Sequence, residues 1–204
     1  MNEDVYESLR FLKGESVRLK RENLELRQEV SMLHGVLDAL RALQEVSTSI
    51  DTNTNILGLL DRILASALSS IDASDGSLML VDEESDELVF VVVHGSVAGS
   101  LTGYRVPIGV GIAGWVAEHR EAVIVPDVRF DPRFSFEVDQ VFRFRTRSMV
   151  SVPIMYGDRL LGVIEALNKA NGEKFNRADL TLLGVVAQLA ATAMKKAETV
   201  TVTA

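Results

Sequence analysis

Leucines recur at every seventh residue near the start of the chain, and this heptad repeat constrains the fold more than any other feature. Leu12, Leu19, Leu26, Leu33 and Leu40 fall on one repeating position, which we assign as d. No proline interrupts residues 5–47. Such spacing is typical of an α-helix whose leucine stripe packs against another helix. The sequence therefore predicts a coiled coil over residues 1–48.

The other heptad positions predict the orientation of the partner helix. Asn23 falls on an a position, where a buried amide pairs with its twin across a dimer axis. Acidic residues at the g positions would face basic residues at the partner's e positions, which favours a parallel dimer. A single amphipathic helix packed on its own domain remains the alternative interpretation. The predicted dimer interface comprises Leu12, Leu19, Asn23, Leu26, Val30, Leu33, Leu37 and Leu40.

Composition excludes several classes of partner. The 204 residues carry a formal net charge of −8, which provides no general attraction to nucleic acid. The chain has no cysteine, so disulfides, thiolate catalysis and cysteine-ligated metals are excluded. No apolar run reaches the roughly 18 residues needed to span a membrane, and the N-terminus does not resemble a signal peptide. We expect a cytoplasmic protein without a nucleic-acid or membrane partner.

Residues 49–198 predict one α+β domain, followed by a short tail at 199–204. An apolar helical face runs from Ile56 to Ile71, with Asp51 or Thr52 as a candidate cap. Alternating apolar patterns then predict two hairpins, one at 77–95 and one at 148–169. Between them we expect a strand at 104–107, a helix at 111–120, a strand at 121–125 and a long loop at 126–147. An amphipathic helix at 176–196 closes the domain, and we expect an antiparallel sheet covered on one face by helices.

The segment GVGIAG at 109–114 spells G-x-G-x-x-G between a strand and a helix. A dinucleotide site of this kind requires further βαβ units, whereas this chain offers hairpins. Two interpretations remain open at this point. The glycines permit a tight strand-to-helix turn, or the free amides of Ile112 and Ala113 at the helix start form a cradle for an anion.

Three longer segments together resemble a GAF domain: YRVPIGVGIAGWVAEHREAVIVPDVRFDPRF, FRTRSMVSVPI and GVIEALNK. The resemblance runs from about residue 51 to residue 197 and is strongest to the cyclic-nucleotide-binding GAF domains of phosphodiesterases and adenylyl cyclases. It implies a central antiparallel sheet with helices packed on it. The family signature is matched by Asn168, Lys169, Phe175 and Asp179. An ion pair between Lys169 and Asp179 would connect the last strand to the final helix.

The resemblance also implies a ligand pocket. In this family Ser77 and His94 correspond to positions that contact a base, and Ile112 and Ala113 to the amides that hold a cyclic phosphate. The chain departs from the nucleotide-binding pattern at Val93 and His94, at Ser135 and at Phe142. The implied ligand-binding residues are Ser77, His94, Ile112, Ala113, Asp127, Val128, Phe134, Thr146 and Glu165.

Weaker candidates lie outside this pattern. His94 and His119 could ligate haem or a metal, but they lack the local spacing of a ligand set. Arg143, Arg145 and Arg147 alternate with phenylalanine and could bind an anion or form a solvated face. The sequence identifies no cofactor and no catalytic residue, and the family's methionine sulfoxide reductases require cysteines.

These observations favour a dimeric regulatory sensor that binds a small anionic ligand, with cyclic nucleotides among the candidates. Its signal would pass to a downstream signalling protein or output domain that the sequence does not identify. The alternative is a ligand-free dimerisation or assembly module with a filled pocket. A cavity of roughly 300 Å³ or more beneath residues 127–147 would favour the sensor, and a plugged interior would favour the assembly module.

Overall fold

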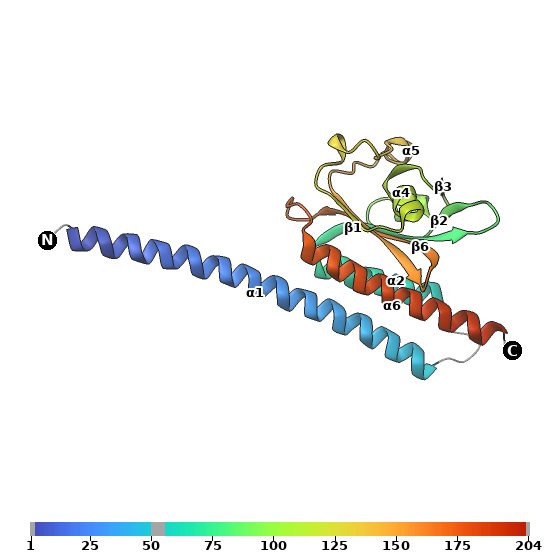
Figure 1. Cartoon of the computed structure of the whole chain (residues 1–204), viewed down its shortest axis with the longest axis horizontal. Helices are drawn as coiled ribbons and strands as arrows, with labels where there is room; N and C mark the ends of the chain where they lie inside the picture. Colours follow the sequence, from blue (N-terminus) through green and yellow to red (C-terminus); the bar gives the residue numbers. More distant parts are fainter. Residues whose placement is uncertain (1–2, 50–55, 203–204) are drawn as a thin grey trace.

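The computed structural model contains a long N-terminal helix and a six-stranded antiparallel sheet with helices on both faces (Figure 1). It describes residues 3–49 and 56–202, with only the backbone for parts of the first helix. The predicted cap at Asp51 or Thr52 and the side chain of Leu40 lie outside the described residues. The helices are α1 (Glu3–Ser49), α2 (Ile56–Ser70), α3 (Ala98–Leu101), α4 (Gly111–His119), η1 (Val128–Phe130), α5 (Glu137–Phe142) and α6 (Arg177–Val202).

The sheet has the strand order β3-β2-β1-β6-β5-β4. Both predicted hairpins are present, as β1–β2 and β5–β6, and the two pair along β1 and β6 at the centre. The short strands β3 and β4 form the two edges. The strands are β1 (Ala73–Asp82), β2 (Glu87–His94), β3 (Arg105–Pro107), β4 (Val123–Val125), β5 (Met149–Tyr156) and β6 (Arg159–Lys169).

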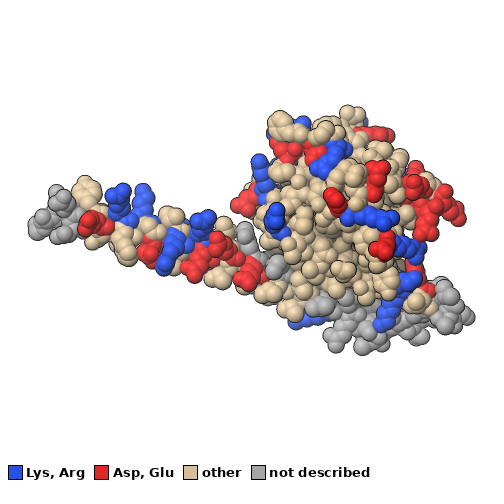
Figure 2. Space-filling view, viewed as in Figure 1, with Lys and Arg blue, Asp and Glu red and all other residues tan. Residues whose placement is uncertain are grey.

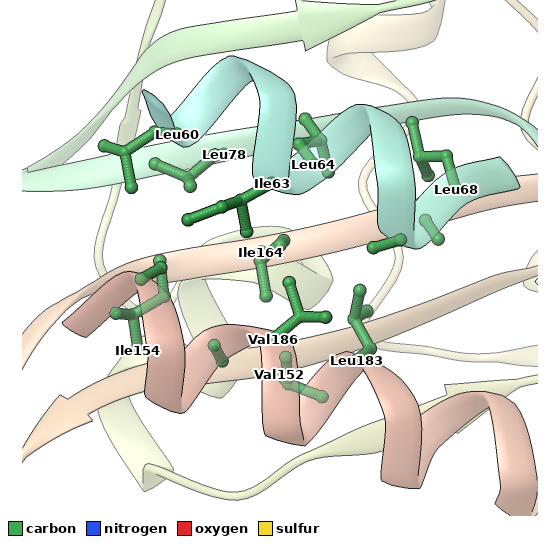
Figure 3. Close-up of a cluster of buried hydrophobic side chains, with 14 of the residues drawn as sticks. Leu60, Ile63, Leu64, Leu68, Leu78, Val152, Ile154, Ile164, Leu183 and Val186 are labelled. Carbon is green, nitrogen blue, oxygen red and sulfur yellow. The ribbon is translucent and has the colours of Figure 1, made fainter. Parts of the chain in front are cut away.

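One face of the sheet is covered by α2 and α6. Their apolar side chains point at the strands, as Figure 3 shows for Ile63 and Leu64 of α2 and Leu183 and Val186 of α6. All four side chains are completely buried. Within the apolar helical face predicted from Ile56 to Ile71, Leu57 is 46% exposed, whereas Leu59 is buried.

The opposite face carries a second apolar cluster. Met79, Phe90 and Val163 of the sheet pack there with Ile112 and Val116 of α4. The expectation that helices cover only one face was therefore incomplete. The sheet is an interior layer, and we call its two sides the α2/α6 face and the α4 face.

A buried ion pair joins the end of β6 to the start of α6. Lys169 Nζ lies 2.9 Å from Asp179 Oδ1, and both side chains are less than a tenth exposed. The second carboxylate oxygen accepts a hydrogen bond from the Asn176 amide at 2.8 Å, and the Phe175 ring lies 5.7 Å from the ammonium group. The predicted ion pair is thus present, and it fixes the last helix against the last strand.

Helix α1 projects well beyond the domain at its N-terminal end, and its C-terminal half lies along α2 and α6 (Figure 1). Leu24 and Arg27 lie beside residues of α2 and α6, and Val36 packs against the core beneath those helices. The helix thus packs on its own domain, as the alternative interpretation predicts. Figure 2 shows acidic and basic side chains intermixed along its projecting part.

The heptad stripe of α1 nevertheless stays uncovered. Leu12, Leu19 and Leu26 are 61%, 55% and 54% exposed. Leu33 and Leu37, on the segment that lies against the domain, are still 52% and 49% exposed. The domain therefore contacts α1 through other positions and leaves the stripe accessible at the apolar positions whose side chains the structure describes.

Helix α6 is longer than predicted and continues to Val202, into the segment expected to be a tail. Among the described residues it is the one helix that is long and apolar enough to cross a membrane by those two criteria. Its inner side chains, including Leu182, Leu183 and Val186, form part of the core. Its apolar composition is therefore accounted for by packing within the domain.

We expect Asp179→Ala to lower the free energy of unfolding by about 3–5 kcal/mol, because it leaves Lys169 charged and unpaired in the interior. Urea denaturation would measure the loss. The double variant Lys169→Met/Asp179→Leu removes both charges and should recover most of the stability. Glu121→Ala, at an exposed position, is the control and should change stability by no more than about 0.5 kcal/mol. An Asp179→Ala variant as stable as this control would contradict the structural role of the pair.

Candidate functional site

A cavity of about 120 Å³ lies between the α4 face of the sheet and the segments that cover it. Strands β1, β2 and β6 form its floor, and α4, α5 and the chain around Phe134 form its cover. Apolar side chains dominate the wall, including Phe90, Tyr104 and Phe142. The structure brings seven predicted ligand-binding residues to this cavity, namely Ser77, His94, Ile112, Ala113, Phe134, Thr146 and Glu165.

Three polar side chains form a row across the centre of the sheet. Glu165 on β6 pairs in register with Ser77 on β1 and with Ser151 on β5. Glu165 Oε1 and both serine hydroxyls are buried and make no hydrogen bond of good geometry in the described structure, although the two hydroxyls lie close enough to interact with the carboxyl group. A buried polar group without a partner costs about 1–3 kcal/mol. The floor of the cavity is therefore a polar and incompletely satisfied part of the interior.

Burial raises the pKa of Glu165 to about 7, because the apolar surroundings disfavour the carboxylate. The adjacent Ser151 and Ser77 hydroxyls act in the opposite direction and offset only part of this rise. A substantial fraction of Glu165 is consequently a neutral acid at neutral pH. In that form it can donate a hydrogen bond into the cavity as well as accept one.

The start of α4 faces the cavity opposite this floor. Gly109 and Gly111 have positive φ angles of 87° and 69°, and a side chain on Gly114 would collide with the Pro107 carbonyl oxygen. The glycines thus form a tight strand-to-helix turn, and the antiparallel sheet excludes the dinucleotide interpretation. The turn leaves the amides of Ile112 and Ala113 in the first helical turn, where a helix favours negative charge.

The cover is closed by hydrogen bonds between α5 and the segment before β5. Asp139 accepts hydrogen bonds from the Thr146 amide and the Thr146 hydroxyl, each at 2.8 Å. Asn168 donates to the Arg145 carbonyl oxygen at 3.1 Å and accepts from the Arg147 amide at 2.8 Å. Residues 143–147, which we call the lid segment, are thereby fixed at both ends. Asn168 therefore positions the cover from outside the cavity.

Two predicted ligand-binding residues lie elsewhere. Val128 is 1% exposed and packs in the apolar cluster of the α4 face. Asp127 pairs with Arg129 at 2.6 Å on the outer side of the lid segment, and this guanidinium lowers the pKa of the Asp127 carboxyl to about 2. The four positions that depart from the nucleotide-binding pattern, Val93, His94, Ser135 and Phe142, all line the cavity.

The two histidines considered as haem or metal ligands are in separate environments. His94 Nε2 lies 3.0 Å from an Asp61 oxygen on α2, at the edge of the cavity. The His119 ring stacks on Trp115 at the end of α4. Within the described residues, no three His, Asp or Glu side chains are placed to hold a metal ion.

Three residues that contribute to the site were not predicted from the sequence. Tyr104 packs edge-on against Phe142 in the cavity wall, with ring centroids 5.1 Å apart. Asp139 lies in α5, a helix of six residues within a segment that shows no periodicity. Ser151 could have been found, because it is a polar residue at an inward position of an apolar strand.

Comparisons with known proteins identify the architecture. The family model described as GAF domain matches residues 55–194. A dual 3',5'-cyclic-AMP and -GMP phosphodiesterase 11A from Takifugu rubripes is 34% identical over 149 residues, which are 68% of this chain and 16% of that protein. This chain thus corresponds to about a sixth of that relative.

Solved structures share the fold at lower identity. A GAF domain from a phosphoenolpyruvate-protein phosphotransferase of Coxiella burnetii is 18% identical, with a TM-score of 0.67 over 80% of this chain and 96% of that one. A free methionine-R-sulfoxide reductase from Neisseria meningitidis is 23% identical, with a TM-score of 0.65 over 79% of this chain and 89% of that one. At these identities the likeness concerns the fold.

The raised pKa of Glu165 predicts a pH dependence of stability. Between about pH 4.5 and pH 7 the folded protein binds more protons at this site than the unfolded chain, so stability falls as the pH rises through this window. Relative to Glu165→Gln, which cannot ionise, the wild type should lose on the order of 3 kcal/mol across it. Urea denaturation of both proteins from pH 4.5 to pH 8 measures the difference. Parallel curves would show that Glu165 titrates normally.

Proposed function

This chain belongs to the GAF domain family, and on that premise we propose that it is a non-enzymatic sensor that binds a small molecule and signals as a homodimer. In this proposal residues 49–198 form the sensory domain and residues 1–48 the parallel coiled coil. Its regulatory role agrees with the similarity to a phosphodiesterase that contains a related segment. We expect it to act in the cytoplasm on a separate signalling protein or output domain.

The observation that carries the sensory role is the unsatisfied polar floor of the cavity. A domain that served only for assembly would gain stability by filling this space with apolar side chains. Instead Ser77 Oγ and Glu165 Oε1 are buried beside the cavity and make no hydrogen bond of good geometry. A bound molecule with a hydrogen-bonding group would satisfy both.

The geometry also supports a particular kind of ligand. The floor offers a hydroxyl and a partly protonated acid, and the opposite wall offers the helix start at Ile112 and Ala113. A compact molecule with an anionic group at the helix start and a neutral polar group at Glu165 suits both ends. At about 120 Å³ the cavity is smaller than the roughly 300–1,000 Å³ typical of drug-sized ligands. A cyclic nucleotide would therefore require the lid segment to move outward.

The uncovered stripe of α1 supports the dimer. Seven apolar residues of the heptad stripe remain about half exposed or more although the same helix packs on its domain. Exposed apolar area of this regularity is characteristic of a coiled-coil seam. The seven residues are Leu9, Leu12, Leu19, Leu26, Val30, Leu33 and Leu37.

Two other functions are weaker. The small volume of the cavity is the observation that favours a ligand-free assembly module. The fold likeness to methionine sulfoxide reductases does not favour catalysis, because thiol chemistry requires a cysteine and the sequence has none.

A thermal-shift screen with cyclic mononucleotides, cyclic dinucleotides, haem and metabolite acids tests the sensory role. A ligand at 100 times its dissociation constant should add about 2.7 kcal/mol of stability. We expect Ser77→Leu, which places a larger apolar side chain into the cavity, to abolish the shift while preserving the fold. The matched exposed control Ser85→Leu should retain it. If no compound stabilises the wild type, the assembly module becomes the better explanation.

The absence of cysteine allows the coiled coil to be tested by introducing single thiols. Ser16 lies at an a position, so Ser16→Cys should form a disulfide with its twin under mild oxidation if the helices are parallel and in register. Arg18→Cys, two residues on and directed away from the seam, should remain largely uncross-linked. Equal cross-linking of both variants, or of neither, would contradict the parallel dimer.

Sedimentation tests the leucine stripe itself. Leu19→Glu/Leu26→Glu places charge in the seam and should convert dimers to monomers at micromolar concentration. Phe11→Glu/Val17→Glu alters two residues that are 69% and 63% exposed but lie off the stripe, and it should leave the dimer intact. A monomeric wild type would overturn this part of the proposal.

A further inference from the structure

A second hollow lies on the outer side of the lid segment. This groove encloses about 610 Å³ and is bordered by Arg129, Gln140, Arg143, Arg145 and Arg147, and by the turn at Lys174. The sensory cavity lies on the inner side of the same segment. We call this hollow the arginine groove.

The lid segment presents different residues to its two sides. Arg143, Arg145 and Arg147 are exposed and border the groove, whereas Phe144 is half-buried and Thr146 is buried, and both also line the sensory cavity. Arg143 ends α5 in a left-handed conformation with a φ of 53°, and from Phe144 to Arg147 exposed and buried side chains alternate. The hydrogen bonds from Asn168 to the backbone of Arg145 and Arg147 hold this arrangement. Arg145 and Arg147 are therefore presented together by a fixed backbone, and Arg143 at the end of α5 borders the same groove.

Positive charge in the groove is not neutralised by its own acids. In the part of the chain that the structure describes, no carboxylate pairs with Arg143, Arg145 or Arg147. Asp127 pairs with Arg129, and Asp139 keeps its negative charge while it accepts both hydrogen bonds from Thr146. The five cations Arg129, Arg143, Arg145, Arg147 and Lys174 nevertheless outnumber the three carboxylates Asp127, Asp139 and Glu173 at the groove. Lys174 adds a further positive charge at the rim, against the free carboxylate of Glu173. This local excess of positive charge contrasts with the whole chain, in which 29 acidic residues outnumber 21 basic residues.

We propose that the arginine groove is a second binding site, which takes an oligophosphate anion such as the triphosphate of a nucleotide or a free polyphosphate. Guanidinium groups bind phosphate oxygens in pairs of parallel, charge-assisted hydrogen bonds. The groove volume falls within the range of small-molecule sites. The net charge of −8 disfavours a nucleic-acid strand, whereas a compact anion needs only the local field of the groove.

Titration of the full chain with ATP and with tripolyphosphate, followed by calorimetry at low salt, tests this site. We expect saturable binding that weakens as salt is added. Arg145→Gln/Arg147→Gln should weaken it at least about tenfold, because two charge-assisted contacts are lost. Both side chains are exposed, so the fold should persist, which an unchanged urea midpoint would verify. The control Arg120→Gln/Arg177→Gln removes the same charge from exposed positions outside the groove and should bind as the wild type does.

The outcomes separate the possible sources of the anion. Tighter binding of ATP than of tripolyphosphate would assign the site to nucleotides, with the exposed ring of Phe136 beside the groove as a contact for the base. Equal binding would assign it to the phosphate chain alone. Failure of both compounds to bind, an equal loss in both double variants, or binding only of an acidic peptide such as hexaglutamate would overturn the proposal.

This test is independent of the sensory cavity. Ser77→Leu alters the cavity floor and leaves the groove untouched, so oligophosphate binding should survive in that variant. Loss of binding there would place the anion in the cavity and overturn the separate site. A negative result in the screen of cavity ligands leaves the groove measurement unaffected, so the two proposals fail separately.

Discussion

Two consecutive residues at the end of β6 hold the two sides of the domain together. Asn168 binds the backbone of the lid segment above the α4 face, and Lys169 forms the buried ion pair with Asp179 on the α2/α6 face. Asn168 has a φ of 53°, a left-handed conformation that asparagine tolerates better than most residues. Side chains of a strand already alternate between the two faces, and Leu167 packs on the α4 face, so this turn shifts the alternation and places Asn168 at the lid segment and Lys169 beside Asp179. The family signature is therefore structural: it places the cover of the cavity and the final helix relative to one strand.

The central sheet is apolar toward α2 and α6 but carries a polar row toward α4. Ile164 and Ala166 of β6 are completely buried in the α2/α6 face, while Glu165 between them points to the other side. Strand alternation alone produces this difference. The apolar surroundings raise the pKa of the Glu165 carboxyl group, so part of it stays protonated at neutral pH. The burial that destabilises the ligand-free domain therefore also provides a group that can donate a hydrogen bond to a ligand. Stability and recognition thus oppose each other at one residue.

Sequence patterns predicted the parts of this fold where periodicity is strong. The two hairpins, α4 and α6 begin within a few residues of their predicted positions, because alternating or helical apolar residues extend over whole elements. Helix α5 was missed because six residues give too little periodicity to detect. The family resemblance correctly predicted that Ser77 and Glu165 line the cavity, because the register of the strands fixes their positions. It placed Asp127 and Val128 less well, because the path of a long loop depends on contacts such as that between Asp127 and Arg129.

The projecting part of α1 has the geometry of a lever. Residues 3–23 extend beyond the domain for about 30 Å at the 1.5 Å rise of an α-helix, while the remainder of α1 rests on α2 and α6. These supporting helices lie directly behind the sheet that forms the cavity floor. A tilt of a few degrees where α1 contacts α2 and α6 would move the N-terminal end of the helix several times farther than the contact itself. Subtle rearrangements within the globular part would accordingly be magnified at the far end of the molecule.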